Sequence, residues 1–408
     1  MRTLFCAALI LVLSGCAAPD YMQRGQKTPE SLQSFEGKIG VRQLWSVKLG
    51  DGNRYADHGL VPALADGRIY VADWDGDVYA VEAKTGRRVW DADLDEELAG
   101  GPTVGDGVVA IGTRAGEVVG LSAKDGSVLW RSGVTSEVLT PPAYGDGLFV
   151  VRSADGRVFG LRSSDGSRSW LYDRTVPVLT LRGNSPPVIA GGRALVGLDN
   201  GKLVALDLKT GEQAWEATIG IPRGRTDLER MVDVDGRISE ARGTAYVSAY
   251  QGRTMAVDVE SGNSVWTRDV PSYDGTAEDV GNVYVTDDDQ RVWALDRFNG
   301  ASVWRQDRLS KLRLTAPVVF GKYVVVGSND GYLNWLSRDN GKLEARTRLE
   351  PLSPSERDAA IRPNAMERYV FVPPDWIAQP PTVTNGRLYV WTLKGQLAAY
   401  RLKGQSRQ

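Results

Sequence analysis

The chain has 408 residues, of which 42% are hydrophobic and 25% charged, and its net charge is -2. This balance of signs argues against the basic surface of a nucleic-acid-binding protein, so no nucleic-acid partner is expected. The hydrophobic content is ordinary for a soluble domain, and after the first 15 residues no apolar run is long enough to cross a bilayer.

The first residues have the pattern of a secretion signal. Arg2 precedes a short apolar run that leads into Leu13-Ser14-Gly15-Cys16. This motif resembles the bacterial lipobox, in which the chain is cut before the cysteine and the thiol carries a diacylglycerol. We therefore expect residues 1–15 to be a signal peptide and Cys16 to be lipidated, which would give stable membrane anchoring. An ordinary signal peptide with a chance cysteine is the alternative.

The residue after the lipobox cysteine is Ala17, where an aspartate would favour the inner membrane, so we expect the periplasmic face of the outer membrane. Residues 16–40 carry few apolar side chains and predict a flexible tether. Residues 41–403 are expected to form the folded body, which contains no cysteine, and residues 404–408 a short tail.

A repeat organises the body. A tryptophan recurs about every 40 residues. In most cases it is the last residue of a sequence motif that contains an apolar pair, a turn glycine and the tryptophan itself. These residues are Trp45, Trp90, Trp130, Trp170, Trp215, Trp266 and Trp304. Each unit follows a turn glycine, at Gly67, Gly107, Gly147, Gly192, Gly243, Gly281, Gly321 and Gly386. We interpret the tryptophans as packing residues between neighbouring units, because no unit of this size can bury its own apolar face.

One unit shows the expected strands. Residues 148–151 form an apolar run, residues 157–161 alternate, and residues 168–170 begin an outer strand, with turn glycines between them. A fourth strand is expected ahead of each proline, since a proline at the edge of a sheet needs no partner for an N–H. Each unit is therefore predicted to be a four-stranded antiparallel blade.

The ends of the repeat predict how the blades are arranged. The seventh unit has Ala345 where tryptophan is due, and the eighth ends at residues 400–402 without an outer strand. Residues 44–49 form an outer strand with no unit before it. If this strand completes the eighth blade, the chain is an all-β, closed, eight-bladed β-propeller without exposed sheet edges at the junction.

Residues for catalysis are scarce. His58 is the only histidine and lies near no nucleophile motif, so no catalytic triad, zinc site or other catalytic residue is predicted. The aspartates at Asp73, Asp75 and Asp77, and at residues 287–289, lack the distal glutamate of a calcium loop. We interpret them as turn residues and expect no metal and no cofactor.

A first resemblance concerns the repeat. The phrase at residues 205–215 is similar to the tryptophan-docking repeat of quinoprotein alcohol dehydrogenases. That resemblance implies the same eight-bladed ring, but those enzymes are longer and carry a neighbouring cysteine pair beside the quinone, which this body lacks. A quinone-dependent dehydrogenase is therefore an alternative function, as is a generic periplasmic propeller that binds peptides or glycans.

Two segments interrupt the repeat, residues 176–187 with the pattern Leu-x-Leu-Arg-Gly and residues 223–235 with the pattern Asp-Val-Asp. Together with the lipobox and the ring, they resemble the BamB family, the lipoproteins of the outer-membrane β-barrel assembly machinery. The resemblance implies a non-catalytic scaffold that aids delivery, folding and insertion of outer-membrane proteins, whose unfolded chains are possible partners.

In that family the two segments lie on neighbouring blades and contact a periplasmic POTRA domain of BamA, the barrel-inserting subunit. The resemblance assigns this role to Leu179, Leu181 and Arg182 in the first segment and to Asp233 and Asp235 in the second. Two alternatives remain open: Arg182 pairs internally with one of the aspartates, or the leucines belong to a blade core.

One stretch departs from the family pattern. Residues 349–378 are rich in proline and longer than we expect, and they contain the apolar run at residues 369–372. A loop of this length is expected either to add a short strand or to cover a surface of the ring.

Overall fold

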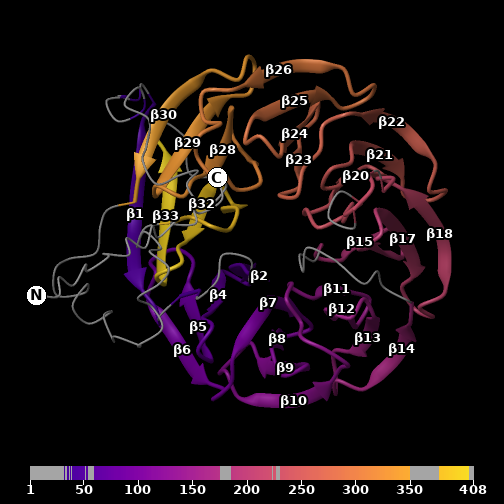
Figure 1. Ribbon diagram of the computed structural model, residues 1–408. Helices are drawn as coiled ribbons and strands as arrows, with labels where there is room; N and C mark the ends of the chain where they lie inside the picture. The colour runs from indigo at the N-terminus through magenta and orange to yellow at the C-terminus, as the bar shows by residue number, and fades with distance from the viewer. Residues whose placement is uncertain are drawn as a thin grey trace, which may run out of the picture.

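The computed structural model describes residues 32, 35, 37, 39–50, 52–53, 59–174, 185–222, 224–226, 230–349 and 376–403. Within this part of the chain, 33 strands form eight sheets that stand around one central axis (Figure 1). The architecture is an eight-bladed β-propeller, as the repeat predicts. No helix in the described part of the chain has both the length and the apolar character needed to cross a membrane.

Each blade contributes one strand to each of four concentric layers, and blade 2 has a fifth strand, β2 (Gly59–Leu60), which pairs parallel with β7. The innermost strands are β3 (Ala63–Ala65), β7 (Leu98–Gly105), β11 (Ala143–Gly145), β15 (Val188–Ala190), β19 (Ser239–Ala241), β23 (Thr276–Glu278), β27 (Val318–Phe320) and β31 (Thr382–Thr384). The second strands are β4 (Arg68–Ala72), β8 (Val108–Thr113), β12 (Leu148–Arg152), β16 (Arg193–Gly197), β20 (Thr244–Ser248), β24 (Asn282–Thr286), β28 (Tyr323–Gly327) and β32 (Arg387–Trp391). The third strands are β5 (Asp77–Glu82), β9 (Glu117–Ser122), β13 (Val158–Arg162), β17 (Lys202–Asp207), β21 (Thr254–Asp258), β25 (Val292–Asp296), β29 (Tyr332–Ser337) and β33 (Gln396–Leu402). The outer strands are β6 (Arg88–Asp93), β10 (Val128–Gly133), β14 (Arg168–Tyr172), β18 (Gln213–Thr218), β22 (Ser264–Arg268), β26 (Ser302–Gln306), β30 (Leu343–Arg348) and β1 (Val41–Lys48).

The ring closes at blade 8. Blades 1 to 7 are consecutive in sequence, from β3–β6 to β27–β30, whereas blade 8 has the order β31-β32-β33-β1. Strand β1 pairs antiparallel with β33, from Val41 opposite Leu402 to Lys48 opposite Gln396. Figure 1 shows the first and last strands side by side. The prediction that the N-terminal strand completes the last blade is confirmed.

The innermost strands correct one detail of the prediction. Several follow a proline instead of preceding it: β11 begins directly after Pro142, and β27 directly after Pro317, whereas β7 contains Pro102. The proline can stand here because the innermost edge faces the central axis and requires no N–H for a ladder. The short piece between the proline and the next turn glycine is enough for three paired residues, as in Ala143 opposite Val150.

The hydrophobic core lies between blades. Second and third strands such as β12 and β17 are buried along most of their length, and their side chains join clusters that span two neighbouring blades. One cluster combines Val150 and Trp170 of blade 3 with Leu206 of blade 4. A single blade therefore cannot bury its own apolar surface, which explains why the repeat must form a ring.

Seven of the blade junctions are closed by the recurring tryptophans. Each indole nitrogen donates a hydrogen bond of 2.8–3.3 Å to a carbonyl of the next blade: Trp45 to Ala83, Trp90 to Ala123, Trp130 to Ser163, Trp170 to Leu208, Trp215 to Val259, Trp266 to Arg297 and Trp304 to Arg338. The indole also packs on the turn glycine of that next blade, so a Cβ added at Gly126 would lie 2.7 Å from Trp90. The structural interpretation of the tryptophans is confirmed.

The two ends of the propeller differ. At one end, here called the turn face, each blade makes tight turns such as those at Gly147 and Gly166, both with positive φ. At the other end, the connection face, outer strands lead into the next blade, through residues 173–187 between β14 and β15 and residues 219–238 between β18 and β19. Residues 185–187 and 230–235, described parts of the two segments that interrupt the repeat, therefore lie on the connection face.

Part of the stretch expected to be a tether packs on the ring. Leu32 is 2% exposed and belongs to a cluster of blades 6 and 7, and Ile39 packs against a cluster of blades 7 and 8. Apolar side chains spaced among polar ones bury well even where the average composition is polar. At Leu32, Phe35 and Ile39 the chain therefore packs on the ring, unlike the flexible tether expected for residues 16–40. Cys16 and His58 lie outside the described residues.

Candidate partner-binding site

The two connections come together on neighbouring blades. Ser185, at the end of the first connection, is completely buried and its Oγ donates a hydrogen bond of 2.9 Å to the carbonyl of Gly236 in the second. A Cβ added at Gly197 would meet both Ser185 and Val234, so the backbones approach closely. Leu179, Leu181 and Arg182 themselves lie outside the described residues.

The second connection combines exposed and buried parts. Ile221 is 52% exposed at its start, whereas Met231, Val232 and Val234 are buried further along. The Val232 carbonyl and side chain lie against Gly201, in the turn between β16 and β17. The connection is therefore held on blade 4 by its apolar residues and presents Ile221 to solvent.

Asp233 lies beneath this surface, since it is only 1% exposed. Its carbonyl accepts a hydrogen bond of 2.9 Å from the Tyr250 amide, which ties the connection to blade 5. The sequence resemblance assigned Asp233 to direct contact with a partner. In this conformation, Asp233 is covered, and it shapes the connection from below.

Two further residues complete a buried charged group with the aspartates. Arg152 at the end of β12 and Asp199 in the β16–β17 turn form an ion pair, with side chains that are 0% and 4% exposed. Neither Arg152 Nε nor Nη1 has a hydrogen-bond partner among the described residues. Sequence reasoning missed both residues, because Arg152 follows an apolar strand and Asp199 resembles an ordinary turn aspartate.

Asp235 has an unusual environment. Both carboxylate oxygens are buried and have no hydrogen-bond partner within the described residues. The pKa of Asp235 is raised to about 7, first by burial and then by the charges of Asp233 and Asp199, against the opposing effect of Arg152. Arg152 is thus paired with Asp199 while its charge also acts on Asp235.

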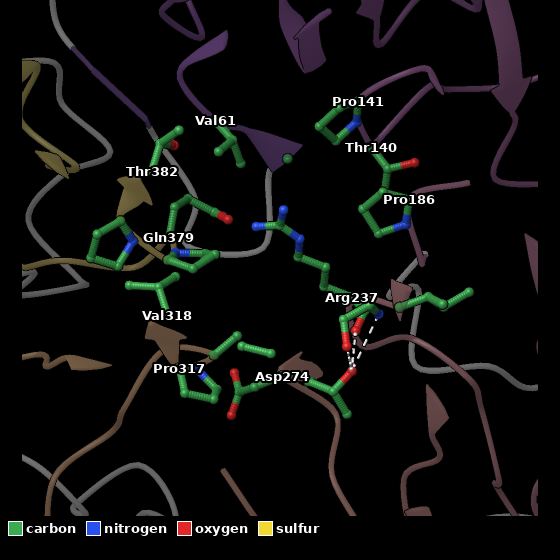
Figure 2. Close-up of a pocket in the computed structure, with 18 of the residues that line it drawn as sticks. Val61, Thr140, Pro141, Pro186, Arg237, Asp274, Pro317, Val318, Gln379 and Thr382 are labelled. Atoms are coloured by element: carbon green, nitrogen blue, oxygen red, sulfur yellow. Dashed lines mark hydrogen bonds between the residues drawn. The ribbon is translucent and has the colours of Figure 1, made fainter. Parts of the chain in front are cut away.

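A cavity of about 1080 Å³ lies within the ring, and Asp235 forms part of its wall. Its lining comes from the starts of the blades and is rich in proline, including Pro141, Pro186 and Pro317. Figure 2 shows Arg237 extending into the middle of this space.

The end of the proline-rich stretch reaches the same cavity. Trp376 lies on its wall, while Ile377 is completely buried and lies against Gly327 of blade 7. Residues 350–375, most of that stretch, lie outside the described residues. The expectation that it covers a ring surface holds for its last residues.

The acidic stretches stabilise turns. Asp73 Oδ1 accepts hydrogen bonds from the amides of Asp75 and Asp77, at 3.1 and 2.9 Å. Asp287 accepts from the Asp289 amide at 3.0 Å and pairs with Arg291 at 2.7 Å. These contacts confirm the interpretation as turn residues. In the described ranges, no group of three or more His, Cys, Asp or Glu residues is arranged to hold a metal ion.

Comparison with known proteins gives a consistent result. The family model described as "Outer membrane protein assembly factor BamB" matches residues 40–97 and 74–306. A protein of that name from Alkalilimnicola ehrlichii is 48% identical, over 98% of this chain and 97% of the relative. Another from Pseudomonas aeruginosa is 42% identical, over 97% of each chain.

Solved structures show the same fold. The crystal structure of BamB from Moraxella catarrhalis has a TM-score of 0.76 at 23% identity, covering 88% of this chain and 99% of that one. A quinohemoprotein alcohol dehydrogenase from Pseudomonas putida has a TM-score of 0.66 at 14% identity, covering 94% and 79%. At these identities both similarities concern the fold alone.

The fold and its junctions define a class, the closed eight-bladed propellers built from tryptophan-docking repeats. Within this class, the match of the family model and the nearly full-length similarity to its members decide the family. The chain belongs to the BamB family of outer membrane protein assembly factors.

Proposed function

We propose that this protein is a non-catalytic scaffold in the assembly of outer-membrane proteins, and that it docks on a POTRA domain of BamA through its connection face. Family membership supports the assembly role. The hydrogen bond from Ser185 to the Gly236 carbonyl supports the site, because it brings the two segments that interrupt the repeat together at one end of the ring.

The residues of the proposed interface have two different roles. Leu179, Leu181 and Arg182 provide the direct contacts, with apolar side chains at the centre and a guanidinium that fixes orientation. Asp233 and Asp235 act from beneath, together with Arg152 and Asp199, by holding the second connection in the shape that the partner meets. The burial of Asp233 supports this division.

The anchor proposed for the chain is a lipid on Cys16, which would hold the propeller at the periplasmic face of the outer membrane. We propose unfolded outer-membrane proteins as further partners. Mass spectrometry of the membrane-extracted protein tests the anchor: an N-terminal diacylated cysteine is expected, and a mature chain that starts elsewhere would contradict it.

Co-purification with BamA tests the docking site. The double variant Leu179→Ala with Arg182→Ala should lose association, because truncation of interface hot spots costs about 2 kcal/mol or more each. A matched control is Leu129→Ala with Arg131→Ala, an exposed pair on the outer strand β10, which should leave association unchanged. Equal recovery of BamA with both double variants would show that the site lies elsewhere.

A further inference from the structure

The regular blades share a large–small residue pair. In each, the outer-strand tryptophan lies opposite an alanine or glycine of the third strand, as in Trp90 with Ala80 and Trp130 with Gly120. A Cβ added at Gly120 would lie 2.2 Å from Trp130, so the small residue leaves the space that the indole fills. The same arrangement joins Trp45 to Ala399 in blade 8.

Blade 7 exchanges the two residues. Here the tryptophan is Trp335, on the third strand β29, and the small residue opposite it is Ala345, on the outer strand β30. Trp335 is completely buried, and its indole nitrogen donates a hydrogen bond of 3.1 Å to Thr347 Oγ1. Its ring meets the Tyr323 ring edge-on, with 6.0 Å between the ring centres. As a result, the indole of blade 7 lies on the third strand instead of the outer strand. At the junction with blade 8, the outer strand carries only the methyl group of Ala345 at this position.

Blade 8 is exceptional in a second way. Its third and outer strands, β33 and β1, come from opposite ends of the chain, so no turn joins them and no turn glycine can lie against blade 7. Gly37 takes that place. A Cβ added at Gly37 would lie 2.5 Å from the Ala345 Cβ, which is the contact that a turn glycine makes with tryptophan at the other junctions.

Residues around Gly37 fix this segment on blade 7. Arg346 Nη1 donates a hydrogen bond of 3.1 Å to the Leu32 carbonyl, and the Arg308 guanidinium lies 5.2 Å from the centre of the Phe35 ring. Arg346 is itself held by Asp330 at 2.6 Å, and its side chain is 1% exposed. Hydrophobic burial of Leu32 and Ile39 completes the attachment.

We propose that Leu32, Phe35, Gly37 and Ile39 form an N-terminal strap that locks the junction of blades 7 and 8, and that the outer face of blade 7 is its docking surface. The strap replaces the outer-strand tryptophan that this junction lacks, while Trp335 belongs to the same core cluster as Leu388 and Ala398 of blade 8. Ring closure therefore depends on residues outside the repeat, on the part of the chain that leads toward the N-terminus.

Hydrogen–deuterium exchange of the full-length protein tests the strap. Gly37→Val should accelerate exchange of the β30 amides by about tenfold or more, while β12 and β16 stay protected. Gly133→Val is the matched control, because a Cβ at Gly133 meets nothing within 4 Å. Exchange in β30 that is equally slow in both variants would overturn the proposal.

A second set of variants covers the case in which Gly37→Val does not fold. Leu32→Ala with Phe35→Ala should loosen β30 in the same way. Adding Trp335→Ala and Ala345→Trp restores the regular pair, and the indole should then close the junction without the strap. The β30 amides of this fourfold variant are then compared with those of Leu32→Ala with Phe35→Ala. If their hydrogen–deuterium exchange is equally fast, the swapped positions of Trp335 and Ala345 are not the reason for the strap.

Discussion

The Ser185 hydroxyl donates a hydrogen bond of 2.9 Å to the Gly236 carbonyl, in a contact from which solvent is excluded. This bond joins two chain segments that lead into blades 4 and 5. Because a buried hydrogen bond contributes on the order of 1 kcal/mol, it can fix the relative position of the two connections without dominating the stability of the ring.

Ser185→Ala should therefore weaken partner binding more than stability. We expect the affinity for BamA to fall roughly fivefold, the equivalent of about 1 kcal/mol, with little change in Tm. Ser302→Ala, on the exposed outer strand of blade 6, is the control and should change neither. Binding measured by surface plasmon resonance distinguishes the two; unchanged affinity in Ser185→Ala would show that the connections hold their positions independently.

Arg152 should be essential to the fold. Arg152→Met leaves Asp199 as an unpaired carboxylate in the interior, and loss of one partner of a buried pair typically costs about 3–5 kcal/mol. Arg131 is the control, since its side chain is 40% exposed and its ion pairs with Glu96 and Glu117 contribute at most about 1 kcal/mol. Urea denaturation of both methionine variants measures the difference, and similar losses would contradict the assignment.

Two glycine variants can separate the steric clash with tryptophan from the backbone strain of a positive φ. Gly126 and Gly107 both have positive φ, 79° and 74°, but a Cβ at Gly126 meets Trp90 at 2.7 Å whereas one at Gly107 meets nothing within 4 Å. Gly126→Val should destabilise the protein by about 2–3 kcal/mol more than Gly107→Val. Thermal unfolding of the two variants tests this, and equal Tm values would mean that the junction adapts freely.

The stability of the propeller should fall as the pH rises from about 4 to 8. Burial raises the pKa of Asp274 to about 8; nearby Arg313 opposes the rise and Asp288 adds to it. Between these pH values the unfolded chain releases this proton while the folded protein retains it, so the folded state binds more protons and the free energy of unfolding decreases with rising pH. Asp235 acts in the same direction up to about pH 7.

Asp274→Asn removes this titration and should reduce the slope of stability against pH. Denaturant midpoints at pH 4.5, 6 and 8 measure it. Asp165→Asn is the control, because this carboxyl is exposed and Ser167 lowers its pKa instead. A slope that is the same in Asp274→Asn as in the unchanged protein would rule out Asp274 as its source.

The sequence predicts the ring well because its signals are local. Tryptophan and glycine recur within each unit, and the missing outer strand of the last unit matches the extra strand at Trp45, so blade count and closure follow without any distant contact. The position of several innermost strands was predicted on the wrong side of a proline, since a proline is compatible with either side of a sheet edge.

Other features depend on contacts that no local pattern contains. Ala345 is visible in the sequence as a missing tryptophan, but its exchange with Trp335 is evident only from the register of β29 and β30. Likewise, the Asp-Val-Asp pattern does not show that Asp233 is buried, or that the charge of Arg152, from another blade, acts on Asp235. Exposure of the site residues could therefore not be predicted from residue type.

The most direct test of the proposed scaffold is site-specific photo-crosslinking in the cell envelope. Ile221 is 52% exposed on the connection face, and Phe298 is 69% exposed on the turn face of blade 6. A photoreactive residue at Ile221 should capture BamA, and one at Phe298 should not. Capture of BamA from Phe298 alone, or from neither position, would contradict docking through the connection face.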